Sequence, residues 1–270
     1  MNAEALIREG DLQGALTDLQ SHIRSDPSNV SSRIFLFELL SMLGDWPRAT
    51  KQLDVLADLD PGSLAIVHLY RDAILCEQLR VSVFSGANSP LVFGEPEEWL
   101  ARLTEALRLS NEQHASEEVE QVLADNLSQA YELAPEVSGT VNGEEFAWIA
   151  DGDSRLGPVL ETVINGKYYW VPFNRISQVV IEAPQNLREF VWMPANFVWA
   201  NGGESFGLIP TRYVGSDQCE DSRLQSARLT EWAEFGDGLY TGLGQRMLTT
   251  DNGDYPLMDV REITISNPAE

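Results

Sequence analysis

Two aspartates and an arginine that could share one chemical site stand close together in the segment Asp151-Gly152-Asp153-Ser154-Arg155. Paired carboxylates can divide the roles of acid and base, and a guanidinium can hold a phosphoryl group. The segment also begins like a calcium-binding loop, but Leu156 and Thr162 occupy the positions of that loop's turn glycine and bidentate glutamate. Calcium binding is therefore excluded, and phosphoryl or glycosyl chemistry stays open.

A purely structural interpretation of this segment is an Asx turn, in which an aspartate side chain accepts a hydrogen bond from the backbone two residues further on. Arg155 would then hold the carboxylates in place by charge-assisted hydrogen bonds. The pattern favours this interpretation. The chemical alternative is an enzyme or small-ligand-binding module that uses Asp151, Asp153, Arg155 and Arg212.

A second motif, Gly203-Glu204-Ser205-Phe206-Gly207, matches the G-x-S-x-G pattern of a hydrolase nucleophile. That pattern needs a strand before the serine and a helix after it, but Pro210 follows within a few residues. The general base of that fold is a histidine downstream of the serine, whereas His22, His68 and His114 all lie upstream. A hairpin turn accounts for the glycines better.

The remaining reactive residues indicate neither a cofactor nor a metal. Gly166-Lys167-Tyr168 lacks the hydroxyl residue and the upstream glycine of a phosphate loop. Cys76 and Cys219 stand far apart, and neither has a Cys or His neighbour at metal-ligand spacing. We therefore expect no disulfide framework, no bound metal, no cofactor and no catalytic residue.

The charge of the chain narrows the choice of partners. Its 270 residues include 42 acidic and 18 basic residues, which gives a formal net charge of −24. Such a field repels phosphate backbones and anionic lipids, so we expect neither nucleic acid nor membrane as a partner. The first residues have no apolar signal core, and no stretch approaches the roughly 20 apolar residues of a membrane span. These features predict a cytoplasmic protein.

The elements that must position these residues begin with a repeat. Gly10-Asp11-Leu12 and Gly44-Asp45-Trp46 lie 34 residues apart, and so do Asp26-Pro27 and Asp60-Pro61. This period, with glycine at the turn between two helices, is the signature of the tetratricopeptide repeat. We expect a tetratricopeptide-like α-α superhelix over residues 1–135. Such a stack either binds a peptide or helix on its concave side or packs on its own C-terminal domain.

Helices are also predicted after the two clear repeats. Ala65 to Leu79 forms a degenerate third unit, and two further helices run from Pro96 to Leu107 and from about Ser116 to Tyr131. Between them, Val81 to Glu95 contains two glycines and a proline and is predicted to be a loop.

The second half of the chain is rich in glycine, aromatic and β-branched residues. It holds four Asn-Gly pairs, the strongest short hairpin signal, beginning at Asn142, Asn165, Asn201 and Asn252. The predicted strands are 159–164, 168–173, 176–181, 197–200, 206–209, 246–249 and 261–265. The pattern predicts a strand-rich α+β domain over residues 140–270, and hence a multi-domain α and β protein.

Aromatic residues are dense in this half. Tyr168, Tyr169, Trp170, Trp192, Trp199 and Trp232 could form a recognition surface, but aromatic residues at strand spacing more often belong to a core. The candidates for a partner-binding or structural role are Asp151, Asp153, Arg155, Trp170, Trp192, Arg212 and Tyr213.

Four motifs of the second half stand out: the segment from Trp148 to Pro158, the segment from Ile164 to Pro172, Ile209-Pro210-Thr211-Arg212-Tyr213 and Gly244-Gln245-Arg246. Together they resemble the ImpE family, also called TagJ, of type VI secretion accessory proteins. The resemblance implies a two-domain cytoplasmic protein without established catalysis. It also implies two partners, namely an N-terminal helix of the smaller subunit of the contractile sheath and the disassembly ATPase ClpV.

The leading hypothesis is therefore a non-catalytic adaptor. In it, an amphipathic helix of a sheath subunit lies in an apolar groove, which supplies affinity, while charges at the rim supply specificity. The rival hypothesis is the enzyme or small-ligand module around Asp151. The sequence leaves the oligomeric state open, as well as which half binds which partner.

Overall fold

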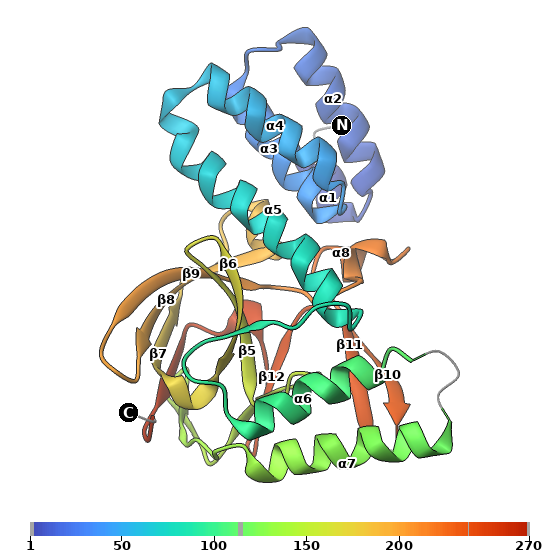
Figure 1. The fold of residues 1–270 in the computed structure, drawn as a ribbon. Coiled ribbons are helices and arrows are strands. Elements are labelled where there is room, and N and C mark those ends of the chain that lie inside the picture. Colours follow the sequence, from blue (N-terminus) through green and yellow to red (C-terminus); the bar gives the residue numbers. More distant parts are fainter. Residues whose placement is uncertain (1–2, 113–115, 237, 269–270) are drawn as a thin grey trace.

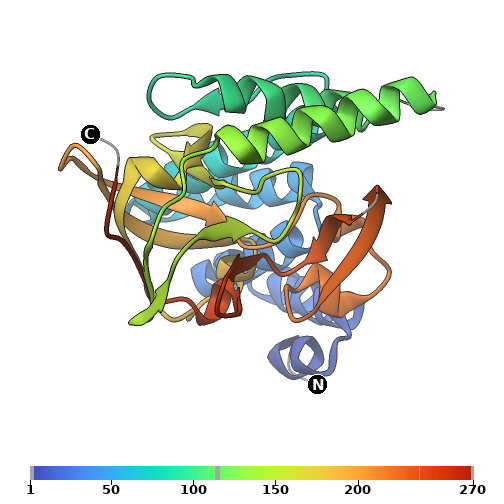
Figure 2. The same ribbon diagram turned by 90° about the horizontal axis from the view of Figure 1, so that it is seen from below.

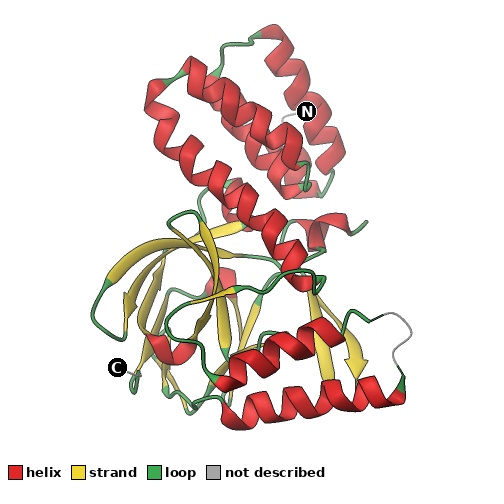
Figure 3. Ribbon diagram, viewed as in Figure 1, coloured by secondary structure: helices red, strands yellow, loops and turns green. Residues whose placement is uncertain are grey.

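The computed structural model describes residues 3–112, 116–236 and 238–268. The first four α-helices gather at one end, the strands lie at the other end together with helices α6 and α7, and one long helix, α5, runs from the first group to the second (Figures 1 and 3). The α-helices are α1 (Ala3–Glu9), α2 (Leu12–Ser25), α3 (Val30–Met42), α4 (Trp46–Leu59), α5 (Leu64–Phe84), α6 (Glu98–Leu109), α7 (Glu117–Leu133) and α8 (Ser222–Gln225). The single-turn 3-10 helices are η1 (Pro61–Ser63), η2 (Phe173–Arg175), η3 (Leu187–Phe190), η4 (Ser216–Gln218) and η5 (Leu257–Asp259).

The two predicted repeats form two helix pairs, α1–α2 and α3–α4. Each second helix starts at an aspartate after the glycine turn: the Gly14 amide donates to Asp11 (2.8 Å), and the Arg48 amide donates to Asp45 (3.2 Å). Behind each cap, the apolar residues at helical spacing are buried, among them Leu12, Ala15, Leu16, Leu19, Ala49, Leu53 and Leu56. The predicted helical-repeat region is confirmed.

Helix α5 is longer than the sequence predicts. It continues to Phe84, and the strand β1 (Leu91–Val92) pairs in parallel with the segment around Tyr169, so the predicted loop from Val81 to Glu95 is wrong at both ends. The helix continues because its last turn is packed rather than solvated: Val83 is fully buried, and the Phe84 ring meets the edge of Trp170 at 6.2 Å. Tertiary packing here overrides the local turn signals.

The second half contains the strands that the hairpin signals predict, with β8 beginning earlier than predicted, together with several short strands and the unpredicted β10 and β11. They are β2 (Gly139–Val141), β3 (Glu144–Phe146), β4 (Ile149–Asp151), β5 (Val159–Ile164), β6 (Lys167–Pro172), β7 (Ile176–Ile181), β8 (Trp192–Trp199), β9 (Glu204–Pro210), β10 (Thr230–Gly236), β11 (Leu239–Gly244), β12 (Met247–Thr250), β13 (Asp254–Pro256) and β14 (Glu262–Ile265). Asn142 and Asn165 take positive φ at their turns, as Asn-Gly hairpins require.

The described strands form one nine-stranded sheet, in the order β1-β6-β5-β9-β8-β7-β14-β2-β3, and two smaller sheets. Strand β5 shows how the large sheet separates two apolar clusters. Val159 and Val163 belong to a cluster shared with the helices, whereas Leu160 and Ile164 belong to a second cluster formed by strands. The alternation follows from the two-residue period of a strand.

The exposed hairpin of β10 and β11 was not predicted. Most of β10 is solvent-exposed, so its sequence has no buried face to signal a strand. Helices α6 and α7 pack side by side (Figure 2), and the Ser116 side chain caps α7 by accepting from the Val119 amide (3.4 Å). No helix among the described residues has the length and hydropathy that crossing a bilayer demands.

The helical stack packs against the second half of its own chain. Helix α3 contacts η3, and the Trp192 ring lies 5.8 Å from Trp46 and 5.6 Å from Tyr70, between centroids. The repeat turns also touch the second half, since a side chain added at Gly44 would meet Asp217. One apolar cluster thus includes residues of both halves. The division into domains 1–135 and 140–270 stays a prediction.

Arg212 holds this contact by capping the end of α3. Its guanidinium donates to the carbonyls of Met42 (2.6 Å) and Ser41 (3.0 Å), and also to that of Gln225. The last carbonyls of a helix have no partner within it and carry partial negative charge, so a buried cation satisfies them well.

We expect Arg212→Leu to lower the free energy of unfolding by at least about 2 kcal/mol, because buried carbonyls would lose their donors. Urea unfolding followed by tryptophan fluorescence measures this loss, and hydrogen exchange should speed up in the last turn of α3. The matched control is Arg223→Leu, since Arg223 is exposed and pairs with nearby Asp221. Equal stability of both variants would contradict the capping role.

Candidate functional site

The predicted Asp151 segment forms the turn that follows β4. The Asp153 amide donates to Asp151 Oδ1 (2.9 Å), and the Arg155 amide donates to Asp153 Oδ1 (3.0 Å), so two Asx turns follow each other. The Arg155 guanidinium pairs with both oxygens of Asp153, at 2.9 and 2.6 Å. Asp153 also accepts from the Gly242 amide (3.1 Å), which ties the exposed hairpin to this turn.

A buried chain of alternating charges starts at Asp151. Arg246, fully buried, donates through Nη1 to Asp151, through Nη2 to Glu161 on β5, and through Nε to the Pro210 carbonyl (2.9 Å). On the other side of Glu161, Arg80 of α5 donates to both carboxylate oxygens, at 2.7 and 2.9 Å. We call Asp151, Arg246, Glu161 and Arg80 the buried ion network.

Aromatic hydroxyl and indole groups complete the hydrogen bonding of this network. The Tyr213 hydroxyl donates to Asp151 (2.9 Å), and the Tyr168 hydroxyl donates to Glu161 (2.5 Å). Trp170 Nε1 in turn donates to the Tyr168 hydroxyl (2.7 Å). Every ionised group of the network therefore has several partners, which is what burial of charge requires.

Burial and the neighbouring charges shift the acidic groups in opposite directions. Burial raises the pKa of Asp151 to about 6, although Arg246 opposes this effect. Burial acts the same way on Glu161, but the guanidiniums of Arg80 and Arg246 outweigh it and lower the pKa of that carboxyl to about 2. At neutral pH Glu161 is ionised, and Asp151 is largely ionised.

The sequence-predicted residues lie in and around this network. Asp151 belongs to it, and Tyr213 donates to Asp151. Trp170 reaches the network through Tyr168, and the Arg212 carbonyl accepts from Arg80 (2.9 Å). Trp192 Nε1 donates to Glu77 (3.0 Å), a neighbour of Arg80 on α5. Of the seven candidates, Asp151, Asp153, Trp170, Trp192, Arg212 and Tyr213 are buried, and the Arg155 side chain is 17% exposed.

Sequence reasoning missed the residues at the centre. Glu161 carries a signal that could have found it, because it interrupts an apolar strand, and a charge in a fully buried strand needs a buried partner. Nothing local marks Arg80 as that partner, since it stands where the repeat consensus is lost. Arg246 belongs to the Gly244-Gln245-Arg246 motif, but it was not among the candidate site residues.

The four residues of the buried ion network have almost no exposed surface, between 0% and 3% each. Five surface cavities formed by the described residues have none of Asp151, Asp153, Arg155 and Arg212 in their walls. Within the described ranges, no His, Cys, Asp and Glu side chains group as metal ligands would. Ser205 lies inside β9 opposite Phe197, without the helix that a hydrolase nucleophile requires. This arrangement holds structural elements together.

Comparison with known proteins identifies the fold. A family model described as "ImpE protein" matches residues 143–264. Over 263 residues the chain is 44% identical to the "Type VI secretion system accessory component TagJ" of Pseudomonas aeruginosa, covering 97% of this chain and 90% of that protein. The chain belongs to the ImpE family. The crystal structure of a Vibrio parahaemolyticus protein resembles it with a TM-score of 0.85 at 28% identity, covering 97% of both chains.

Membership of the ImpE family confirms the resemblance seen in the sequence motifs. The matched region contains Asp151, Glu161 and Arg246, whereas Arg80 lies outside it, on α5. The buried ion network therefore joins the ImpE region to the helical half of the chain.

We expect Glu161→Leu to destabilise this ImpE-family chain by about 3–5 kcal/mol, because it leaves Arg80 and Arg246 without their shared carboxylate. Urea unfolding at neutral pH measures the loss. The matched control, Arg102→Ala, breaks the Glu98–Arg102 pair on the surface of α6 and should cost less than about 1 kcal/mol. A loss below that of the control would show that the network does not hold the fold.

The lowered pKa of Glu161 also predicts a dependence on pH. Its ordinary value is 4.5, so its ionised form stabilises the fold above pH 4.5, and this contribution disappears as the pH falls toward 2. The difference in unfolding free energy between the native chain and Glu161→Gln should therefore shrink between pH 4.5 and pH 2. Urea titrations at several pH values test it. A constant difference would contradict the shift.

Proposed function

We propose that this chain is a non-catalytic adaptor of a bacterial type VI secretion system, acting in the cytoplasm. Its partners in this proposal are a helix of the smaller sheath subunit and the disassembly ATPase ClpV. The observation that carries the proposal is the 44% identity, over 97% of the chain, to a protein named as an accessory component of this system.

The geometry of the charged residues supports a binding role over a catalytic one. Asp151 and Asp153 accept hydrogen bonds from Arg246, Arg155 and backbone amides, and Arg212 is committed to helix carbonyls. A general acid or base has to reach a substrate, directly or through one water. The side chains of Asp151, Asp153 and Arg212 are buried and bonded to other groups of the protein, so they do not meet that requirement.

The packing of the helical stack constrains where a partner binds. Concave surfaces of such stacks commonly take peptides or helices. Here, side chains of α3 and α5 already contact the second half of the chain, including the Glu38–Arg188 ion pair and the Tyr70–Trp192 contact. A partner helix therefore needs another surface of the molecule.

Titration of the full chain with each purified partner tests the proposal. We expect the smaller sheath subunit, ClpV or both to bind with a dissociation constant of roughly 10 μM or tighter, which corresponds to about −7 kcal/mol. The Asp153→Asn variant should bind equally well and only lose stability. Absence of binding to either partner would contradict the adaptor proposal, as would a small-molecule activity that Asp153→Asn abolishes while the fold is intact.

A further inference from the structure

The helix-facing side of the large sheet is covered over only part of its area. On β8 and β9, Trp192 and Leu208 point to this side and are buried in the cluster that includes the helices. Side chains two and four residues further along a strand point to the same side. The same side therefore continues through Asn196 and Phe206, which are exposed.

Exposed apolar residues lie in the uncovered part. In the sheet register, Val180 of β7 stands opposite Asn196, which stands opposite Phe206, so the three form one row across three strands. Phe206 is 49% exposed and Val180 is 39% exposed. A large aromatic ring left half in water, on the continuation of a buried face, marks a surface that another apolar surface can cover.

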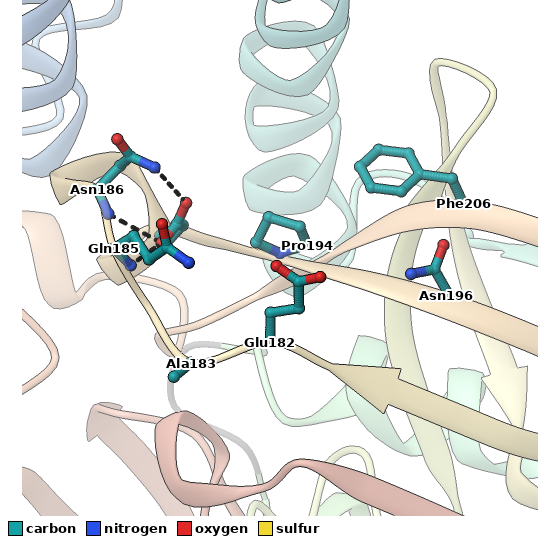
Figure 4. A pocket seen from close by; sticks show the side chains of 8 residues that line it. Glu182, Ala183, Gln185, Asn186, Pro194, Asn196 and Phe206 are labelled. Atoms are coloured by element: carbon teal, nitrogen blue, oxygen red, sulfur yellow. Dashed lines mark hydrogen bonds between the residues drawn. The ribbon is translucent and has the colours of Figure 1, made fainter.

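Three adjoining cavities make this surface a trough. Their volumes are about 240, 430 and 350 Å³, and Phe206 lines all three. Figure 4 shows the first of them, with Glu182, Asn196 and Phe206 around it. We call the surface formed by Asp72, Val180, Glu182, Asn196, Glu204 and Phe206 the Phe206 trough.

The charge of the trough has one sign. Asp72, Glu182 and Glu204 are exposed at its margin, and no lysine or arginine lines any of the three cavities. Among the described residues, no donor is paired with these three carboxylates, whereas nearby Glu189 is occupied with capping η3. The three free carboxylates surround an apolar centre, so the complementary surface is apolar with cationic residues at its edges.

We infer that the Phe206 trough is the docking site for a cationic amphipathic helix of a partner protein. The apolar stripe of that helix covers Phe206 and Val180, and its lysine or arginine side chains meet Asp72, Glu182 and Glu204. This inference rests on the proposed adaptor function and adds the place and the chemistry of the contact.

The geometry favours a helix over an extended peptide. An added strand needs a free sheet edge, but β7, β8 and β9 are interior strands, each with a neighbouring strand on both sides. A helix packs on the face of a sheet, as α5 does over the covered part of the same side. Anionic lipids and nucleic acids are repelled by the free carboxylates.

Binding of the full-length chain to the smaller sheath subunit and to ClpV, by isothermal titration calorimetry, tests the site. Whichever partner the native chain binds should bind Phe206→Glu at least about 30-fold more weakly, as expected for loss of a central anchor. The double variant Glu182→Lys/Glu204→Lys should lose roughly tenfold, and its binding should respond less to added salt than that of the native chain.

Two controls change the same chemistry elsewhere. Tyr240→Glu alters an aromatic residue that is 42% exposed on β11, and Glu120→Lys reverses an acidic residue that lines a different cavity, beside α7. Both should bind within twofold of the native chain. Circular dichroism and the melting temperature of each variant test whether it is folded.

The outcomes separate the inference from the function on which it rests. If the native chain binds a partner and the trough variants bind as well as the native chain, the inference is wrong and the adaptor proposal stands. Loss of binding only in Tyr240→Glu or Glu120→Lys would place the site at α7 and the β10–β11 hairpin instead. A native dimer that Phe206→Glu dissociates would make a second copy the occupant. If the native chain binds neither partner, both proposals fail.

Discussion

A guanidinium without exposed surface has to find all its acceptors inside the protein, and Arg246 finds them on three segments that are distant in the chain: Asp151, Glu161 and the Pro210 carbonyl. Leaving a buried ion unpaired costs several kcal/mol, so the fold is stable only when these three segments lie together. Arg80 of α5 donates to Glu161, so the same requirement also fixes α5 against the sheet. The position of the helical half relative to the sheet follows from this chain of alternating charges.

This constraint has a consequence for binding. Because α5 is held over one part of the sheet, Trp192 packs against Trp46 and Tyr70 and so occupies part of the surface of the helical stack. In the same arrangement Phe206 stays uncovered and is 49% exposed. One arrangement thus uses side chains of the helical stack for contacts within the chain and leaves an apolar surface of the sheet exposed.

The two kinds of acidic residue serve different purposes. Asp151 and Glu161 are buried, paired and committed to the fold, whereas Asp72, Glu182 and Glu204 are exposed and have no cationic partner among the described residues. Exposed carboxylates keep a chain soluble and can steer a cationic partner toward an apolar centre. The excess of acidic residues is therefore explained only in part by the packing of the protein itself.

The sequence by itself determined the features that depend on neighbours in the chain. The 34-residue period, the aspartate caps at Asp11 and Asp45 and the Asn-Gly turns each act over a few residues, so they could be read before the structure was known, as could the family. Only the tertiary structure decided that Glu161 pairs with Arg80 and Arg246, and that the side of the sheet carrying Leu208 is covered while Phe206 stays open. The physical reason is that ion pairing and burial depend on which distant segments meet, and no local pattern encodes that meeting.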